Sequence, residues 1–189
     1  MRQSFDVKGG PAQGRTNLKR LRAVLKQTGL DGVFVPHEDE YQNEYLPEAH
    51  ERLAWATGFT GSAGAAWIFA DRATVFVDGR YTLQAEDQLD PDLFDVVDLM
   101  HPGPAAWLAG QELEGAVLGY DPKLVSPDQL ETIESAAAKA GARLVATAHN
   151  PIDAAWTDRP TPPAEIVKPH ALEFAGETSA DKRARLALA

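Results

Sequence analysis

The densest group of side chains that could bind a metal ion lies between residues 37 and 51. Its members are carboxylates and imidazoles, which are ligands for zinc and for harder divalent cations. They are His37, Glu38, Asp39, Glu40, Glu44, Glu48, His50 and Glu51. Their spacing lacks the His-x-x-x-His and Asp-x-Asp patterns that direct ligands to one point, and metal ligands need a rigid scaffold. We therefore expect a polar, solvated loop here and predict no metal site in this chain.

A glycine-rich segment, residues 58–64, could bind an anion on its backbone amides. It contains Gly58, Gly61 and Gly64 but lacks the Gly-Lys-Ser or Gly-Lys-Thr ending of a phosphate-binding loop. A strand is expected to follow it, where a phosphate-binding loop would be followed by a helix. Close packing of the backbone is the favoured interpretation, and a nucleotide-binding domain is an alternative.

Ser62 lies within this segment and is the candidate nucleophile of a small, self-sufficient hydrolase, with His37 or His50 as its base. The residues around it, Gly-Ser-Ala-Gly, do not form the Gly-x-Ser-x-Gly pattern of a nucleophile elbow. A structural serine is the favoured interpretation, and the hydrolase is kept as an alternative.

Asp78, Gly79, Arg80 and Tyr81 follow an apolar strand directly. The carboxyl ends of strands are where ligands bind in open α/β sheets, so this position favours a functional role. In the structural interpretation, Asp78 caps the following helix and Arg80 forms a surface ion pair.

The composition limits the class of protein. The chain has 189 residues, of which 44% are apolar and 24% charged, as in ordinary globular proteins. Its net charge of −10 argues against nucleic-acid binding, and the absence of cysteine excludes disulfides and thiolate metal sites. The amino-terminal residues do not form a secretory signal, and no apolar run is long enough to cross a membrane. We therefore predict a cytoplasmic protein that contacts neither nucleic acid nor membrane.

The hydrophobic pattern predicts an α/β fold with a mixed, largely helix-covered β-sheet. Strands are expected at residues 32–36, 65–70, 73–78, 93–100, 116–120 and 144–148. Only Asp71 and Arg72 separate the second and third strands, which predicts an antiparallel hairpin. Residues 93–100 alternate apolar and acidic side chains, which places that strand near a sheet edge.

Local signals also predict where helices begin and end. A first helix is expected to be capped by Thr16 or Asn17 and to stop at Gly29. Another is expected to begin after Ser126, with Pro127 at its first position and Gly141 at its end. Shorter helices are expected near residues 50–57, 81–89 and 104–113.

Four parts are expected along the chain: a flexible leader at 1–15, an α/β domain at 16–150, a proline-rich linker at 151–178 and a truncated second domain beginning at 179–189. Five prolines within 151–169 argue for an extended linker. The last eleven residues form a helix pattern, with Ser179 as a possible cap, but have little to pack against. The chain is therefore expected to be a piece of a longer protein.

Several motifs follow one another in an order that resembles the amino-terminal domain of the Xaa-Pro aminopeptidases (aminopeptidase P), which belong to the creatinase and prolidase group. These motifs are residues 39–45, Arg52, residues 58–64, residues 78–81 with Gln84 and Ala85, and residues 156–160. The later pairs Ala175-Gly176 and Asp181-Lys182 resemble the passage into a second, similar domain of the long, three-domain members.

The resemblance implies a mixed α/β domain that carries no catalytic residues. In this family a carboxy-terminal domain of pita-bread fold binds two metal ions, usually manganese, and cleaves the bond before a proline in second position. Its two aspartates, one histidine and two glutamates cannot be matched to this chain. The resemblance therefore implies no cofactor here and two divalent ions in the absent catalytic domain.

The resemblance also implies a role in binding. It places Arg80 near the substrate cleft, where a guanidinium can meet a peptide carboxylate or carbonyl. Asp78 and Tyr81 would orient Arg80, and Gly58, Gly61 and Gly64 would support it. The expected partners are the protein's own catalytic domain, a second copy in a homodimer and the peptide substrate. A dimerisation or adaptor module, which would expose an apolar patch, is a further alternative.

Overall fold

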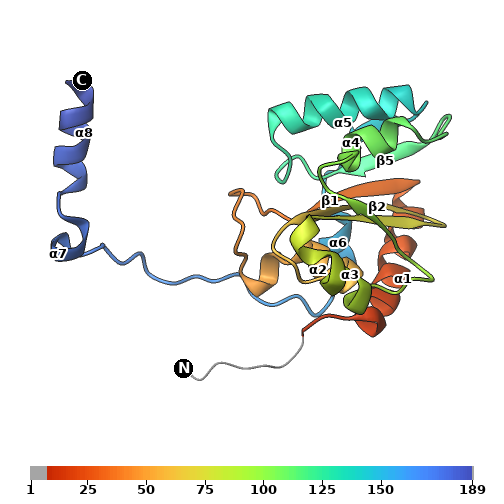
Figure 1. Ribbon diagram of the computed structural model, residues 1–189, viewed down its shortest axis with the longest axis horizontal. Helices are drawn as coiled ribbons and strands as arrows, with labels where there is room; N and C mark the ends of the chain where they lie inside the picture. The colour runs from red at the N-terminus through yellow and green to blue at the C-terminus, as the bar shows by residue number, and fades with distance from the viewer. Residues whose placement is uncertain (1–7, 189) are drawn as a thin grey trace.

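Within residues 8–188, six strands form one mixed sheet with helices on both faces (Figure 1). The computed structural model describes residues 8–188. The strands are β1 (Gly32–Pro36), β2 (Gly64–Phe69), β3 (Ala73–Val77), β4 (Asp95–Asp98), β5 (Val117–Tyr120) and β6 (Arg143–Ala146). Their order is β4-β3-β2-β1-β5-β6. Only β2 runs antiparallel to its neighbours, so the other five strands point the same way.

The helices divide between the two faces of the sheet. They are α1 (Pro11–Thr28), α2 (Arg52–Thr57), α3 (Thr82–Gln88), α4 (Gly103–Ala109), α5 (Pro127–Lys139), α6 (Pro151–Ala155), α7 (Leu172–Ala175) and α8 (Ser179–Ala187), with short 3₁₀ turns η1 (Glu48–His50) and η2 (Gly79–Tyr81). Buried side chains of α1, α2, α3 and α6 form the core on one face. Those of α4 and α5 form the core on the other face.

The central strands β1, β2 and β3 are buried at every position, which is why they are continuous apolar runs. In β1, Val33 and Val35 point to one core while Phe34 points to the other. The predicted hairpin of β2 and β3 and the edge position of β4 are confirmed. The mixed α/β fold is therefore as the sequence predicts.

The helix after Ser126 is also confirmed. The Ser126 hydroxyl accepts a hydrogen bond from the Gln129 amide at 3.2 Å, and Pro127 is the first helical residue. Gly141 follows the helix with a φ of +80°, a left-handed conformation that suits glycine.

The prediction that α1 begins at Thr16 or Asn17 is wrong. The helix begins at Pro11, which favours a first helical position because its missing N–H costs nothing there. Asn17 is buried inside the helix and donates to the Trp55 carbonyl at 2.9 Å. The predicted flexible leader therefore fails for residues 11–15, which are helical, while residues 1–7 lie outside the described part of the chain.

The predicted start of the linker at residue 151 is also wrong. Asn150 caps α6 by accepting from the Ile152 amide at 2.8 Å, and Pro151 begins the helix. Ile152 and Trp156 are buried, so α6 belongs to the domain. Residues 161–174 are exposed, and Figure 1 shows α7 and α8 standing away from the sheet. The cap of α8 is Thr178, not Ser179, because the Thr178 hydroxyl accepts from the Asp181 amide.

Within residues 8–188, none of the helices combines the length and the apolar character that crossing a bilayer requires.

Candidate functional site

The five parallel strands all have their carboxyl ends at the same end of the sheet, so the polar segments that follow them lie together there. We call this end the polar edge. Among the hollows at this edge within residues 8–188 are one beside Asp39 and one beside Ser62. The larger, of about 590 Å³, is lined by residues that follow β1, β5 and β6, and we call it the β1–β5 cleft. The helix after β1 covers one face of the sheet and the helix after β5 covers the other, and such a switch point is where open α/β sheets bind ligands. The smaller hollow, of about 370 Å³, is lined by Glu44, Ser62 and Tyr81 among others.

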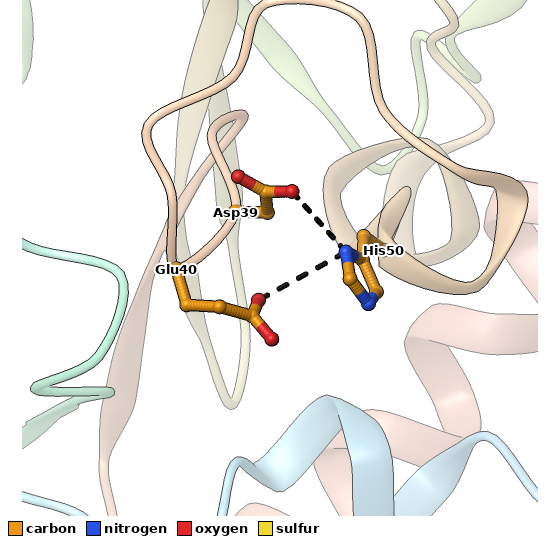
Figure 2. Close-up of side chains that lie close together, drawn as sticks. All are labelled: Asp39, Glu40 and His50. Carbon is orange, nitrogen blue, oxygen red and sulfur yellow. Dashed lines mark hydrogen bonds and ion pairs between the residues drawn. The ribbon is translucent and has the colours of Figure 1, made fainter. Parts of the chain in front are cut away.

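Asp39 organises the loop of residues 37–50 that lines the β1–β5 cleft. One carboxylate oxygen accepts from the amides of Tyr41 and Asn43, at 3.0 and 3.1 Å. The other accepts from the Asn43 side chain at 3.1 Å. It also accepts from Nδ1 of His50 at 3.2 Å (Figure 2). Asp39 is only 1% exposed and His50 is also buried, so the prediction of a solvated loop is wrong at these two residues. Four donors compensate the cost of burying the carboxylate.

Asp39, Glu40 and His50 are the set within residues 8–188 whose ligand atoms could meet at a metal ion, since those atoms lie within 4.8 Å of one another (Figure 2). The oxygens of Asp39 are already hydrogen-bonded. Nη1 of Arg52 lies 3.9 Å from the Glu40 carboxylate, so a fixed cation stands beside the cluster. Three ligands beside a guanidinium do not fit a site for two metal ions held by five ligands.

The pKa of Asp39 predicts how stability depends on pH. Burial acts to raise this pKa, but the hydrogen bonds from Asn43, His50 and Tyr41 outweigh it and lower the pKa from 3.8 to about 2. A lowered folded-state pKa stabilises the protein above the unfolded value and loses that contribution as the pH falls through the folded value. We therefore expect about 2 kcal/mol of unfolding free energy to be lost between pH 4 and pH 2 through Asp39.

The measurement is urea unfolding of wild type and Asp39→Asn across this pH range. The variant should be less stable at neutral pH and should show a flatter decline on acidification. Equal slopes in the two proteins would contradict the assignment to Asp39.

Asp78 and Arg80 interact locally at the carboxyl end of β3. One Asp78 oxygen accepts from the Arg80 amide at 3.0 Å and from its Nε at 2.7 Å, so Asp78 caps η2. These hydrogen bonds lower the pKa of Asp78 and raise that of Arg80. The Arg80 side chain is 65% exposed, and its guanidinium lies 5.4 Å from the centre of the Tyr81 ring. Asp78 therefore caps the turn and Arg80 forms a surface ion pair, as the structural interpretation of the sequence predicts.

Ser62 joins the loop of residues 37–50 to this turn. Its hydroxyl lies 2.7 Å from the Tyr81 hydroxyl and donates to the Glu44 carboxylate at 3.0 Å. Nε2 of His37 is hydrogen-bonded to the Glu44 carbonyl, and Nδ1 of His50 to Asp39. In the described part of the chain neither histidine hydrogen-bonds Ser62, so the nucleophile–base pair of a hydrolase is not assembled.

The glycines of residues 58–64 lie where a side chain would collide with neighbours. A Cβ on Gly58 would lie 2.3 Å from the Gly10 carbonyl oxygen, and one on Gly61 would lie 2.3 Å from the Phe59 ring. A Cβ on Gly64, the first residue of β2, would lie 2.8 Å from the Phe76 carbonyl oxygen. The segment packs closely against backbone and ring atoms, as expected, and a strand follows it.

Sequence reasoning missed Asp153 altogether, and it named Glu44 only as a candidate ligand without its contact to Ser62. Glu44 reaches Ser62 from the loop, and Asp153 reaches Arg52 from α6, 101 residues away in the chain. A family motif contains Arg52, but nothing in its local sequence identifies Asp153 as the partner. The missing signal is tertiary proximity, which short-range patterns do not carry.

The mixed sheet, its two helical layers and the polar edge are those of an α/β domain that belongs to one known family. Residues 17–154 match the family model of the Creatinase/Prolidase N-terminal domain, and the chain belongs to this family. It is 35% identical over 176 residues to the Probable Xaa-Pro aminopeptidase P of Ajellomyces capsulatus, a match that covers 92% of this chain and 28% of the relative. The corresponding Aspergillus niger protein is 36% identical over 168 residues, with 87% and 27% covered. The chain thus spans just over a quarter of the length of these curated relatives.

Two solved structures show the same fold. The X-prolyl aminopeptidase of Caenorhabditis elegans, described as a cytosolic enzyme with a di-nuclear active site, has a TM-score of 0.81 and 28% identity, with 92% of this chain and 30% of that one covered. The N-terminal domain of the cytoplasmic peptidase PepQ from Mycobacterium tuberculosis has a TM-score of 0.57 and 25% identity, with 74% and 98% covered. The family match extends to residue 154, which agrees with the placement of α6 inside the domain.

Proposed function

We propose that the chain is the amino-terminal domain of an Xaa-Pro aminopeptidase, an enzyme that removes the first residue of peptides with proline in second position. The observation that carries the proposal is that one match covers 92% of this chain but only 28% of a relative named Xaa-Pro aminopeptidase P. The reaction then belongs to a carboxy-terminal domain that holds two divalent ions, manganese in our proposal. The di-nuclear active site described for the Caenorhabditis elegans relative supports metal ions in that place.

The domain's own contribution, in this proposal, is a wall of the substrate cleft together with contacts between two copies of the enzyme. Arg80 is the side chain of the wall that meets the peptide. Its exposure, its fixed direction against Asp78 and its place at the carboxyl edge of the sheet support this role. We place the enzyme in the cytoplasm, with its own catalytic domain, a second copy and a peptide as partners.

Arg80→Ala in the longer enzyme is the variant that tests the wall. A charge-assisted hydrogen bond to substrate is typically worth about 1.5 kcal/mol or more, so KM for Xaa-Pro peptides should rise about tenfold. Because Arg80 is exposed, the thermal unfolding midpoint should stay unchanged. Steady-state kinetics on peptides of three to six residues measures the effect.

Arg143→Ala is the matched control, because Arg143 is an exposed arginine at the opposite end of the parallel strands. It should leave KM at the wild-type value. Unchanged kcat and KM in Arg80→Ala, across all peptide lengths, would remove Arg80 from the cleft.

A further inference from the structure

A partly buried ion-pair network lies where the chain leaves the domain. Asp153 of α6 binds two arginines at once. Its carboxylate accepts from Nε and Nη2 of Arg52 at 2.8 and 3.1 Å, and Nη1 of Arg159 lies 2.6 Å from the same group. The Arg52 side chain is only 7% exposed, while the side chains of Asp153 and Arg159 are 30% and 21% exposed, so the pair is shielded from water on the Arg52 side. We call Arg52, Asp153 and Arg159 the exit clamp.

Arg159 also ties the exit to two other elements. Its Nε donates to the carbonyl of Ala49 in η1 at 2.7 Å. Its guanidinium lies 6.0 Å from the centre of the Trp156 ring, and that ring stacks on Trp55 of α2 at 5.5 Å. Arg159 therefore contacts η1 and α6 directly and reaches α2 only through the Trp156 ring, and a planar guanidinium with several donors suits such a junction.

Between residues 160 and 188 the chain makes no comparable polar attachment to the domain, although Pro162 and Pro163 line the β1–β5 cleft. In the part of the chain that the structure describes, every hydrogen bond and ion pair made by residues 160–188 stays within that segment. Pro160, Pro162 and Pro163 follow the clamp directly. Proline-rich segments are semi-rigid and extend by about 3.1 Å per residue, so a direction set at Arg159 is carried on for several residues. Figure 1 shows this segment running out from the domain towards α7.

We propose that the exit clamp fixes the direction in which residues 160–163 leave the domain, with Asp153 as the positioning residue. A fixed exit orients the α/β domain relative to the polypeptide that continues from it. The proposal goes beyond the proposed function, because it would hold whatever reaction the neighbouring polypeptide performs. The alternative is a swivelling exit, which is the default for domains joined by few contacts.

The test uses the 189-residue chain and two nitroxide labels. The chain has no cysteine, so Glu134→Cys on α5 and Ala164→Cys beyond the prolines give one labelled pair of exposed positions. Double electron–electron resonance then measures the distribution of distances between them. We expect a narrow distribution in the otherwise wild-type protein and one roughly twofold broader in Arg159→Gln and Asp153→Asn, as the exit becomes a flexible segment. Arg159→Lys keeps the positive charge but loses the planar guanidinium with its several donors, so the distance distribution should have an intermediate width.

Arg20→Gln is the matched control, because Arg20 pairs with Asp158 of the same exit segment at 3.9 Å but both side chains are exposed. It should leave the width unchanged. Near-ultraviolet circular dichroism of the tryptophans checks that each variant is folded. Arg159 is partly exposed, so the Arg159→Gln variant should fold. If the Asp153→Asn variant does not fold, the width measured in Arg159→Gln alone tests the proposal. Wild-type width in folded Arg159→Gln, or a broad distribution in wild type, would overturn the proposal; neither outcome depends on aminopeptidase activity.

Discussion

Replacing Arg52 with glutamine is expected to lower the free energy of unfolding by about 3 kcal/mol, at the low end of the range for breaking a buried ion pair, because Arg52 is buried but Asp153 is 30% exposed. Burial acts to lower the pKa of Arg52, but its hydrogen bonds and attraction to Asp153 outweigh this effect and raise the pKa. The charged form is therefore the stable partner of the carboxylate. Glutamine would leave Asp153 with Arg159 alone, which is why we expect the lower end of the range. Urea unfolding of the 189-residue chain measures the change.

Arg20→Gln serves as the comparison, because the pair of Arg20 with Asp158 is exposed, with 48% and 79% of the two side chains accessible. Exposed pairs typically contribute between about 0 and 1 kcal/mol. Equal losses of unfolding free energy in the two variants would contradict this prediction. The pair of Arg52 and Asp153 would then stabilise the domain no more than an exposed pair does, and the exit clamp would lack a strong contact with the core.

Gly58→Ala is expected to destabilise the domain by about 3 kcal/mol, for two reasons that add. Gly58 ends α2 with a φ of +86°, which an alanine adopts only at a cost of roughly 1–2 kcal/mol. In addition, the new Cβ would lie 2.3 Å from the Gly10 carbonyl oxygen, so backbone would have to move. That movement would break the hydrogen bond from the Gly10 amide to the Gly58 carbonyl, which is 2.9 Å long.

Gly29→Ala separates the two causes. Gly29 ends α1 with a φ of +70°, but no atom of residues 8–188 outside its chain neighbours lies within 4 Å of the position of its Cβ. It should cost only the conformational part, about 1 kcal/mol. Thermal or urea unfolding of both variants gives the comparison, and equal losses would show that the close approach of Gly58 to Gly10 carries no weight.

Much of the fold is predictable because its signals are local. The buried strands β1, β2 and β3 are apolar runs, and the short connection between β2 and β3 leaves an antiparallel hairpin as the natural choice. The same holds for α5, where Ser126 and Pro127 mark the first turn. The boundary errors also have local causes. Gly10 and Pro11 suggest a flexible leader and Pro151 suggests a linker, but proline is also common at the first helical position, where Pro11 and Pro151 lie.

The polar edge is only partly predictable. Asp78 and Arg80 are two residues apart, so their hydrogen bond follows from the local turn. Asp39 and His50 are separated by 11 residues, and Arg159 contacts Ala49 across 110. Neither pair has a local sequence signal: the first depends on the path of the whole loop, and the second depends on the packing of α6 and the residues after it against η1. For that reason the loop of residues 37–50 was predicted to be solvated, although its central carboxylate is buried.

Cleavage of an Xaa-Pro peptide in the presence of manganese, measured side by side for the 189-residue chain and for the longer protein that contains it, tests the central proposal most directly. We expect the longer protein to release the first residue and the chain alone to release none at the same concentration. Turnover by the chain alone, or none by the longer protein, would contradict the proposal that this domain supports a reaction carried out elsewhere.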